Sequence, residues 1–191
     1  RRFNLFENAV VESILKTEQS CLLKETEINS RKILRRWDSI WWEYVAAKGI
    51  KSKESEELSL KASILFNDYC KYSFTDNNIY PTAGTKITNS KNIDNVLLLG
   101  QADILKVDLT TRNSNFTIID FGNKKRTAEE LFIDPYVWSN IYTLTLNKVE
   151  RVDYIYMGIL EKEKVFYSTS VHFRNEEIKN MEKYIKYYIS G

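Results

Sequence analysis

The first third of the chain carries hydrophobic residues at the three- and four-residue spacing of amphipathic helices. One run spans Phe3–Ile14, a second lies between Ser30 and Gly49, and a third spans Leu58–Cys70. Gly49 stands where a glycine commonly ends a helix, because glycine adopts left-handed backbone angles without strain. We therefore expect residues 1–78 to be helical.

From residue 82 onward the helical spacing gives way to alternation of apolar and polar residues. Two alternating runs flank residues 111–115, whose Thr-Arg-Asn-Ser-Asn composition is typical of a turn, and this predicts an antiparallel hairpin. Asp134 before Pro135 is a strong helix start, an N-cap residue followed by proline at the first helical position. The predicted elements are, in order, strands at 97–109 and 116–121, a helix from Asp134 to about Asn147, strands at 152–160 and 165–171, and a helix from Asn175.

This order of elements predicts one mixed α/β domain over residues 1–191, with a helical N-terminal part (1–78) and an α/β core (82–191). A chain of 191 residues is long enough for one domain with a substantial core. Because the sequence begins with Arg1 rather than Met, we expect it to be cut from a longer protein, whose other domains or subunits would be partners.

Two aspartates interrupt the apolar faces of the predicted hairpin. By alternation, Asp103 shares a face with Leu105 and Val107, and Asp120 shares a face with Phe116 and Ile118. A buried carboxylate is costly without compensation, and two neighbouring carboxylates repel one another. A hard divalent cation such as Mg²⁺ between them is one solution.

An alternative is that both aspartates are purely structural. Asp103 would then hydrogen-bond to a turn or a helix end, and Asp120 would pair with Lys124 or Lys125. Ion pairs of this kind produce the same sequence pattern as a metal site. Patterning alone therefore leaves both interpretations open.

Composition excludes several other classes of protein. A net charge of +2 does not by itself indicate a nucleic-acid binder. Only a local basic patch could indicate that nucleic acid is bound. The two cysteines, Cys21 and Cys70, lie apart among apolar residues, which argues against a zinc site and favours reduced core thiols. No run is apolar enough for a transmembrane helix and no signal peptide is visible, so we expect an intracellular protein without a membrane partner.

Three short motifs in order resemble the RecB-like branch of the PD-(D/E)xK nuclease superfamily. That family places a GxxD motif on one strand, an acidic-x-Lys motif on the next and a QxxxY motif on the following helix. The resemblance implies a restriction-endonuclease-like αβββαβ core, with a mixed sheet flanked by helices. The matching segments here are Gly100-Gln101-Ala102-Asp103, Ile118-Ile119-Asp120-Phe121-Gly122-Asn123-Lys124-Lys125 and Trp138-Ser139-Asn140-Ile141-Tyr142.

The resemblance also implies roles for individual residues. Asp103 and Asp120 match the metal-binding acids, with the carbonyl of Phe121 as a further ligand, for Mg²⁺ or Mn²⁺. Tyr142 matches the aromatic residue that borders the DNA-binding cleft. The implied activity is metal-dependent hydrolysis of phosphodiester bonds, with nucleic acid, DNA rather than RNA, as the expected partner.

The chain departs from the family pattern at two motif positions and upstream of them. The family lysine falls at Gly122, the glutamine falls at Trp138, and the upstream histidine has no match, since His172 lies on a late strand. A glutamate on the first helix, Glu7 or Glu12, could take the place of that histidine.

Lys124 is the candidate catalytic replacement for the lysine missing at Gly122, because its long side chain could reach back toward a phosphate. The alternative is a solvated basic loop of Lys124, Lys125 and Arg126, which still offers phosphate contacts beside the aspartates. Two hypotheses follow. One is an active nuclease, and the other is a catalytically inactive nuclease-fold domain that binds nucleic acid or acts as a scaffold.

Overall fold

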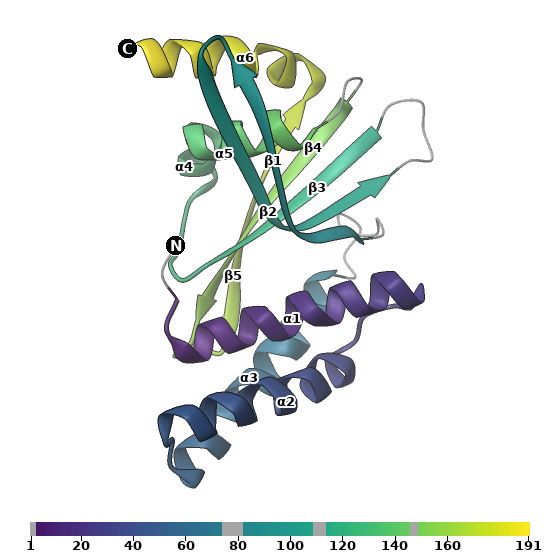
Figure 1. The fold of residues 1–191 in the computed structure, drawn as a ribbon, viewed down its shortest axis with the longest axis vertical. Helices are drawn as coiled ribbons and strands as arrows, with labels where there is room; N and C mark the ends of the chain where they lie inside the picture. Colours follow the sequence, from purple (N-terminus) through teal and green to yellow (C-terminus); the bar gives the residue numbers. More distant parts are fainter. Residues whose placement is uncertain (1–2, 74–81, 109–113, 146–148) are drawn as a thin grey trace. The chain divides into compact units, whose positions relative to one another are not determined.

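The computed structural model describes residues 3–73, 82–108, 114–145 and 149–191. They form a mixed α/β fold, as the order of elements predicted, with a five-stranded mixed sheet (Figure 1). The elements are α1 (Leu5–Lys24), α2 (Ser30–Lys48), α3 (Ser52–Ser73), β1 (Thr82–Ile93), β2 (Val96–Asp108), β3 (Ser114–Gly122), α4 (Ala128–Phe132), α5 (Pro135–Leu144), β4 (Val149–Leu160), β5 (Val165–Arg174) and α6 (Asn175–Ser190).

The chain divides into two compact units. The first contains residues 1–79 with the segments 121–125 and 157–167, and the second contains residues 80–120, 126–156 and 168–191. Strands β3, β4 and β5 contribute residues to both units, whereas α1, α2 and α3 belong to the first alone. Each unit is described by itself below.

The helices of the first unit begin and end at residues with clear capping roles. Asn4 and Glu7 form a capping box at the start of α1, with the Glu7 amide donating to Asn4 Oδ1 at 2.8 Å. Asn29 caps α2, and Gly49 ends it in the left-handed conformation at φ 64°, as the sequence predicted.

Two tryptophans of α2 form the centre of the first unit's helical core. Trp37 and Trp41 are buried, and their rings stack with centroids 4.8 Å apart. Their indole N–H groups donate to the hydroxyls of Ser59 and Ser55 on α3, at 3.2 and 3.0 Å. These bonds satisfy the buried indoles and fasten α2 to α3.

The segments 121–125 and 157–167 of the first unit each contribute a phenylalanine that contacts the other and residues of α3. The ring of Phe121 lies 6.1 Å from that of Tyr69 on α3 and 5.8 Å from that of Phe166. The amide of Phe166 donates to Asp68 on α3 at 2.7 Å. Buried Cys21 and Cys70 are free thiols, as predicted.

In the second unit the predicted hairpin of β2 and β3 is antiparallel, and β1 joins it as a further antiparallel partner of β2. The order of strands in the sheet is β1-β2-β3-β4-β5. Alternation did not single out β1 because most of its side chains are polar and exposed or half-buried. A finer match to a restriction-endonuclease-like core stays a prediction.

Helix α5 packs against β1 and β2 and against α6, and its apolar side enters the core of the second unit. It ends at Leu144, earlier than the predicted end near Asn147, and Thr145 is its C-cap. Lys91 of β1 donates from Nζ to the carbonyls of Tyr142 and Thr145 at 2.6 and 3.0 Å, which satisfies the helix end. The buried core includes Ala102, Phe116, Ile118, Leu131, Val137, Ile141, Leu144, Val152, Tyr154, Tyr156, Phe173 and Met181.

No helix in the described ranges is both long enough and apolar enough to span a membrane.

Candidate functional site

The register of β2 and β3 brings the two predicted aspartates together. Ile104 pairs with Ile119 and Leu105 pairs with Ile118, so the same register sets Asp103 opposite Asp120. The amide of Asp103 donates to Oδ1 of Asp120 at 3.2 Å. The two residues are cross-strand neighbours on the pair of strands that the sequence predicted.

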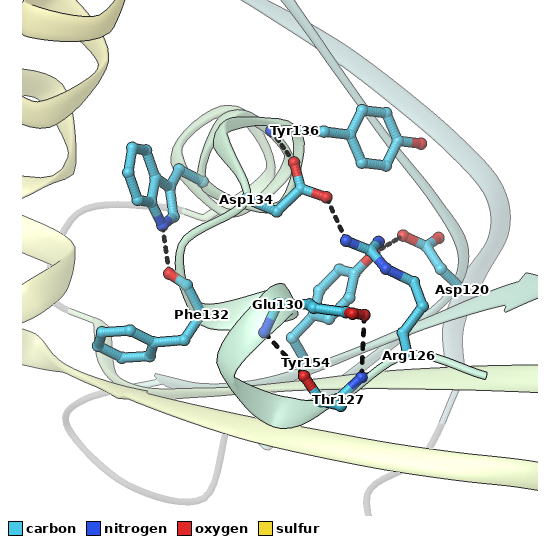
Figure 2. A network of polar contacts seen from close by, with 9 residues as sticks. Asp120, Arg126, Thr127, Glu130, Phe132, Asp134, Tyr136 and Tyr154 are labelled. Atoms are coloured by element: carbon cyan, nitrogen blue, oxygen red, sulfur yellow. Dashed lines mark hydrogen bonds and ion pairs between the residues drawn. The ribbon is translucent and has the colours of Figure 1, made fainter.

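Both carboxylates are buried, and a tyrosine on β4 contacts one of them. Asp103 is 7% exposed and Asp120 is 6% exposed. The hydroxyl of Tyr154, a fully buried residue, donates to Oδ2 of Asp120 (Figure 2). Burial, followed by the charge of Asp120 and its hydrogen bond, raises the pKa of Tyr154 well above its usual value, so the phenol stays a proton donor at neutral pH.

Arg126 places a positive charge near this phenol. Its guanidinium is close enough to Tyr154 to act against the rise of that pKa. It forms an ion pair with Asp134 at 2.6 Å, and the same carboxylate caps α5 by accepting from the Tyr136 amide at 2.9 Å (Figure 2). The hydroxyl of Thr169 donates to the Arg126 carbonyl at 2.8 Å, so the backbone of Arg126 is held as well as its side chain.

Gly100, the glycine of the GxxD-like motif, has a packing role. A Cβ at this position would lie 1.4 Å from Oγ1 of Thr143 on α5, so only glycine fits. Beside it, the amide of Gln101 donates to Oδ1 of Asn140 on α5 at 3.0 Å. Helix α5 therefore packs directly against β2 at Gly100 and Gln101, three and two residues before Asp103 in the sequence.

Trp138 and Tyr142, the two ends of the QxxxY-like segment, are both engaged by the fold. The indole of Trp138 donates to the carbonyl of Phe132 at 2.7 Å. The hydroxyl of Tyr142 donates to Glu182 on α6 at 3.2 Å, and Nζ of Lys91 lies 4.9 Å from the centre of its ring. A role for Tyr142 at a nucleic-acid cleft stays a prediction.

Phe121, Lys124 and Lys125 belong to the first unit, where Lys125 has an acidic and an aromatic neighbour. Nζ of Lys125 lies 4.0 Å from the carboxylate of Glu163 and 5.5 Å from the centre of the Tyr167 ring. The expected role of Lys124 in catalysis and of the Phe121 carbonyl as a metal ligand stay predictions.

The other acidic and histidine candidates have structural partners. Glu7 belongs to the capping box of α1, and Glu12 forms an ion pair with Lys16 at 2.7 Å. His172 contacts Asp153 through Nδ1 at 2.6 Å, and Arg151 contacts the same carboxylate at 2.7 Å.

A divalent cation would find two carboxylates here rather than a complete cage. Within the described ranges, no group of three or more His, Cys, Asp or Glu side chains is arranged to hold a metal ion. Mg²⁺ commonly keeps several waters and takes only one or two carboxylates together with phosphate oxygens of the substrate. Asp103 and Asp120 are the residues that could supply these two carboxylates, and their role as metal ligands stays a prediction.

Sequence reasoning missed Tyr154, Asn140 and the packing role of Gly100. Tyr154 lies in a run, residues 152–160, that the sequence predicted to be a strand, but nothing in the sequence pairs it with Asp120. No known family model matches the chain, and no curated protein matches it either. The geometry of the site is therefore the basis for a functional proposal.

Proposed function

We propose that this chain is a nuclease-type domain that hydrolyses phosphodiester bonds in nucleic acid, with DNA rather than RNA as the expected partner, and depends on Mg²⁺ or Mn²⁺. The observation that carries the proposal is the cross-strand pair of Asp103 and Asp120, both buried, with the Asp103 amide donating to Asp120. A cation bound to both would offset the repulsion between two buried carboxylates that lie in register on adjacent strands.

The protein's own groups orient this pair. Donation from the Tyr154 hydroxyl and from the Asp103 amide fixes the plane of the Asp120 carboxylate. Because the pKa of Tyr154 is raised, this orientation persists across the neutral range. A bound divalent cation would supply Lewis-acid polarisation of the phosphate and a lowered pKa for an attacking water.

Arg126 provides part of the positive charge that the missing lysine would have given. Gly122 has no side chain to neutralise a phosphate, whereas the Arg126 guanidinium lies near Tyr154 and is held by Asp134. A guanidinium binds phosphate oxygens through paired N–H donors, so its contribution would be to substrate binding and charge stabilisation.

Calorimetric titration with Mn²⁺ tests the site. Asp103→Asn and Asp120→Asn should abolish measurable binding, because each removes one of two anionic ligands. Asp153→Asn is the matched control: Asp153 is also 7% exposed, but it pairs with Arg151 and His172, and this variant should bind Mn²⁺ as the wild type does.

The same variants are then assayed for cleavage of single- and double-stranded DNA and RNA. Asp103→Asn and Asp120→Asn should lose the cleavage activity of the wild type, and Asp153→Asn should retain it. A wild-type chain that neither binds Mn²⁺ nor cleaves any of the four substrates would contradict the proposal. An Asp120→Asn chain that cleaves as fast as the wild type would contradict it as well.

A second candidate function is a nucleic-acid-binding module of the same fold without catalysis. It is favoured by Gly122 at the lysine position and by the engagement of both Asp120 oxygens with donors of the protein. This candidate predicts salt-dependent binding of nucleic acid that is unchanged by EDTA and by Asp120→Asn, with no cleavage.

A further inference from the structure

A basic groove lies between α1 and α2 in the first unit, away in sequence from the aspartates. Its volume is about 310 Å³, and its lining includes Lys24, Lys32, Arg35 and Arg36 together with hydroxyl-bearing residues such as Ser20 and Ser39. The two helices that form it are the dark purple and blue helices of Figure 1. Among the residues that the structure describes, no acidic side chain lines it.

Helical spacing explains why these side chains meet. Arg35 and Arg36 each lie three or four residues from both Lys32 and Ser39, the spacing that places residues on one face of α2. Ser20 and Lys24 are spaced in the same way on α1, and both helices line the groove with these faces. The groove is therefore a consequence of two polar helix faces set side by side.

Basic residues outnumber acidic ones on the helix that supplies most of the basic side chains of this groove. Helix α2 carries five basic residues and two acidic ones, although the whole chain has a net charge of only +2. Within the described ranges, Lys24, Arg35 and Arg36 take part in no ion pair. Nζ of Lys32 donates to the carbonyl of Glu27, a neutral partner that leaves its charge in place.

We propose that this groove binds a phosphate group of a nucleic-acid backbone. Guanidinium and ammonium groups beside hydroxyl donors are the groups that proteins use for phosphate oxygens, and like charges gathered in one groove are stabilised by an anion between them. The choice of nucleic acid over a small phosphate ester rests on the proposed function. The inference that the groove binds phosphate rests on its basic and hydroxyl-bearing lining residues alone.

Binding of a fluorescently labelled 20-nucleotide DNA, single-stranded or duplex, tests the proposal by anisotropy. The measurement is made in EDTA, so that it is independent of any metal at Asp103 and Asp120. Arg35→Gln with Arg36→Gln should weaken binding at least tenfold at low salt. The slope of log affinity against log salt should become shallower by about 1 for each phosphate that the variant no longer neutralises.

The matched control removes the same charge from the same helix outside the groove. Arg31 and Lys48 are exposed residues of α2 that do not line it, so Arg31→Gln with Lys48→Gln should change affinity much less. Lys24→Gln on α1 is an independent variant that should weaken binding in the same direction as the α2 pair. Circular dichroism of each variant verifies that the helices are intact.

Several results would overturn the proposal. One is a wild-type chain that binds neither the single-stranded nor the duplex DNA. Another is a groove variant whose DNA affinity, and whose slope of log affinity against log salt, equal those of the Arg31 and Lys48 control. If pyrophosphate binds the groove but does not compete with DNA, the site takes a small phosphate anion and the nucleic-acid assignment is wrong.

The test also separates this proposal from the proposed function. The Arg35 and Arg36 variant should still bind Mn²⁺ as the wild type does, and its loss of DNA affinity is measured in EDTA, where no metal is bound at Asp103 and Asp120. If the chain binds no Mn²⁺, the nuclease proposal fails but the groove proposal is still tested by DNA binding in EDTA. If the groove variants bind DNA like the wild type, the groove proposal fails but the nuclease proposal is still tested by Mn²⁺ binding.

Discussion

Replacing Tyr154 with phenylalanine removes one hydroxyl from the centre of the candidate site and leaves the ring. The hydroxyl donates to Oδ2 of Asp120, a residue only 6% exposed, so no bulk water can replace the missing donor without rearrangement. A hydrogen bond to a charged group contributes about 1.5–3 kcal/mol, and we expect Tyr154→Phe to lower the free energy of unfolding by about 2 kcal/mol at pH 7.

The effect should depend on pH with a defined sign. Because the pKa of Tyr154 is raised in the folded chain, the neutral phenol is favoured there and its stabilisation is fully present below the unfolded value of about 10. As the pH rises above about 10 that stabilisation is lost, since the unfolded tyrosine ionises first. The wild type should therefore lose its advantage over Tyr154→Phe between pH 10 and the folded pKa.

Urea unfolding at several pH values measures the difference in free energy of unfolding between the wild type and Tyr154→Phe. Hydrogen exchange shows which amides lose protection in the variant. A loss of about 2 kcal/mol corresponds to roughly 30-fold faster exchange of the β3 and β4 amides, provided that they exchange through the same opening. Tyr142→Phe is the matched control, because its hydroxyl donates to the largely solvated Glu182 and should contribute less than about 1 kcal/mol.

A double-mutant cycle with Asp120→Asn isolates the pair, and we expect a coupling energy of about 1–2 kcal/mol. Equal stability of wild type and Tyr154→Phe at pH 7 would refute the reasoning. So would a loss for Tyr154→Phe no larger than that for Tyr142→Phe.

Two further predictions concern the packing of α5 against β2 and the hydrogen bonds that Lys91 of β1 donates to the end of α5. Gly100→Ala should cost about 1–3 kcal/mol in urea unfolding, because its Cβ would lie 1.4 Å from Oγ1 of Thr143. Thr143→Gly in the same chain should recover part of that stability, and a strictly additive double variant would contradict the close approach. Lys91→Met should cost about 1–2 kcal/mol, because Nζ of Lys91 donates to the carbonyls of Tyr142 and Thr145. An unchanged urea midpoint would show that water satisfies this helix end equally well.

The sequence by itself determined the local elements whose signals are strong. Gly49 and Asp134-Pro135 marked a helix end and a helix start because these residues have distinct backbone and capping properties. Alternation identified β2 and β3 and assigned Asp103 and Asp120 each to a face of its own strand, whereas the register that sets them opposite one another came from the structure. Alternation has a period of two, so strand faces follow from residue numbers alone.

Only the tertiary structure decided which partners these residues meet. Tyr154 is far from Asp120 in the sequence, and its hydroxyl reaches that carboxylate only because β4 belongs to the same sheet. The need for glycine at position 100 depends on where α5 crosses β2, a distance that no local pattern encodes. Periodicity fixes which way a side chain points, whereas packing between distant segments fixes what it touches.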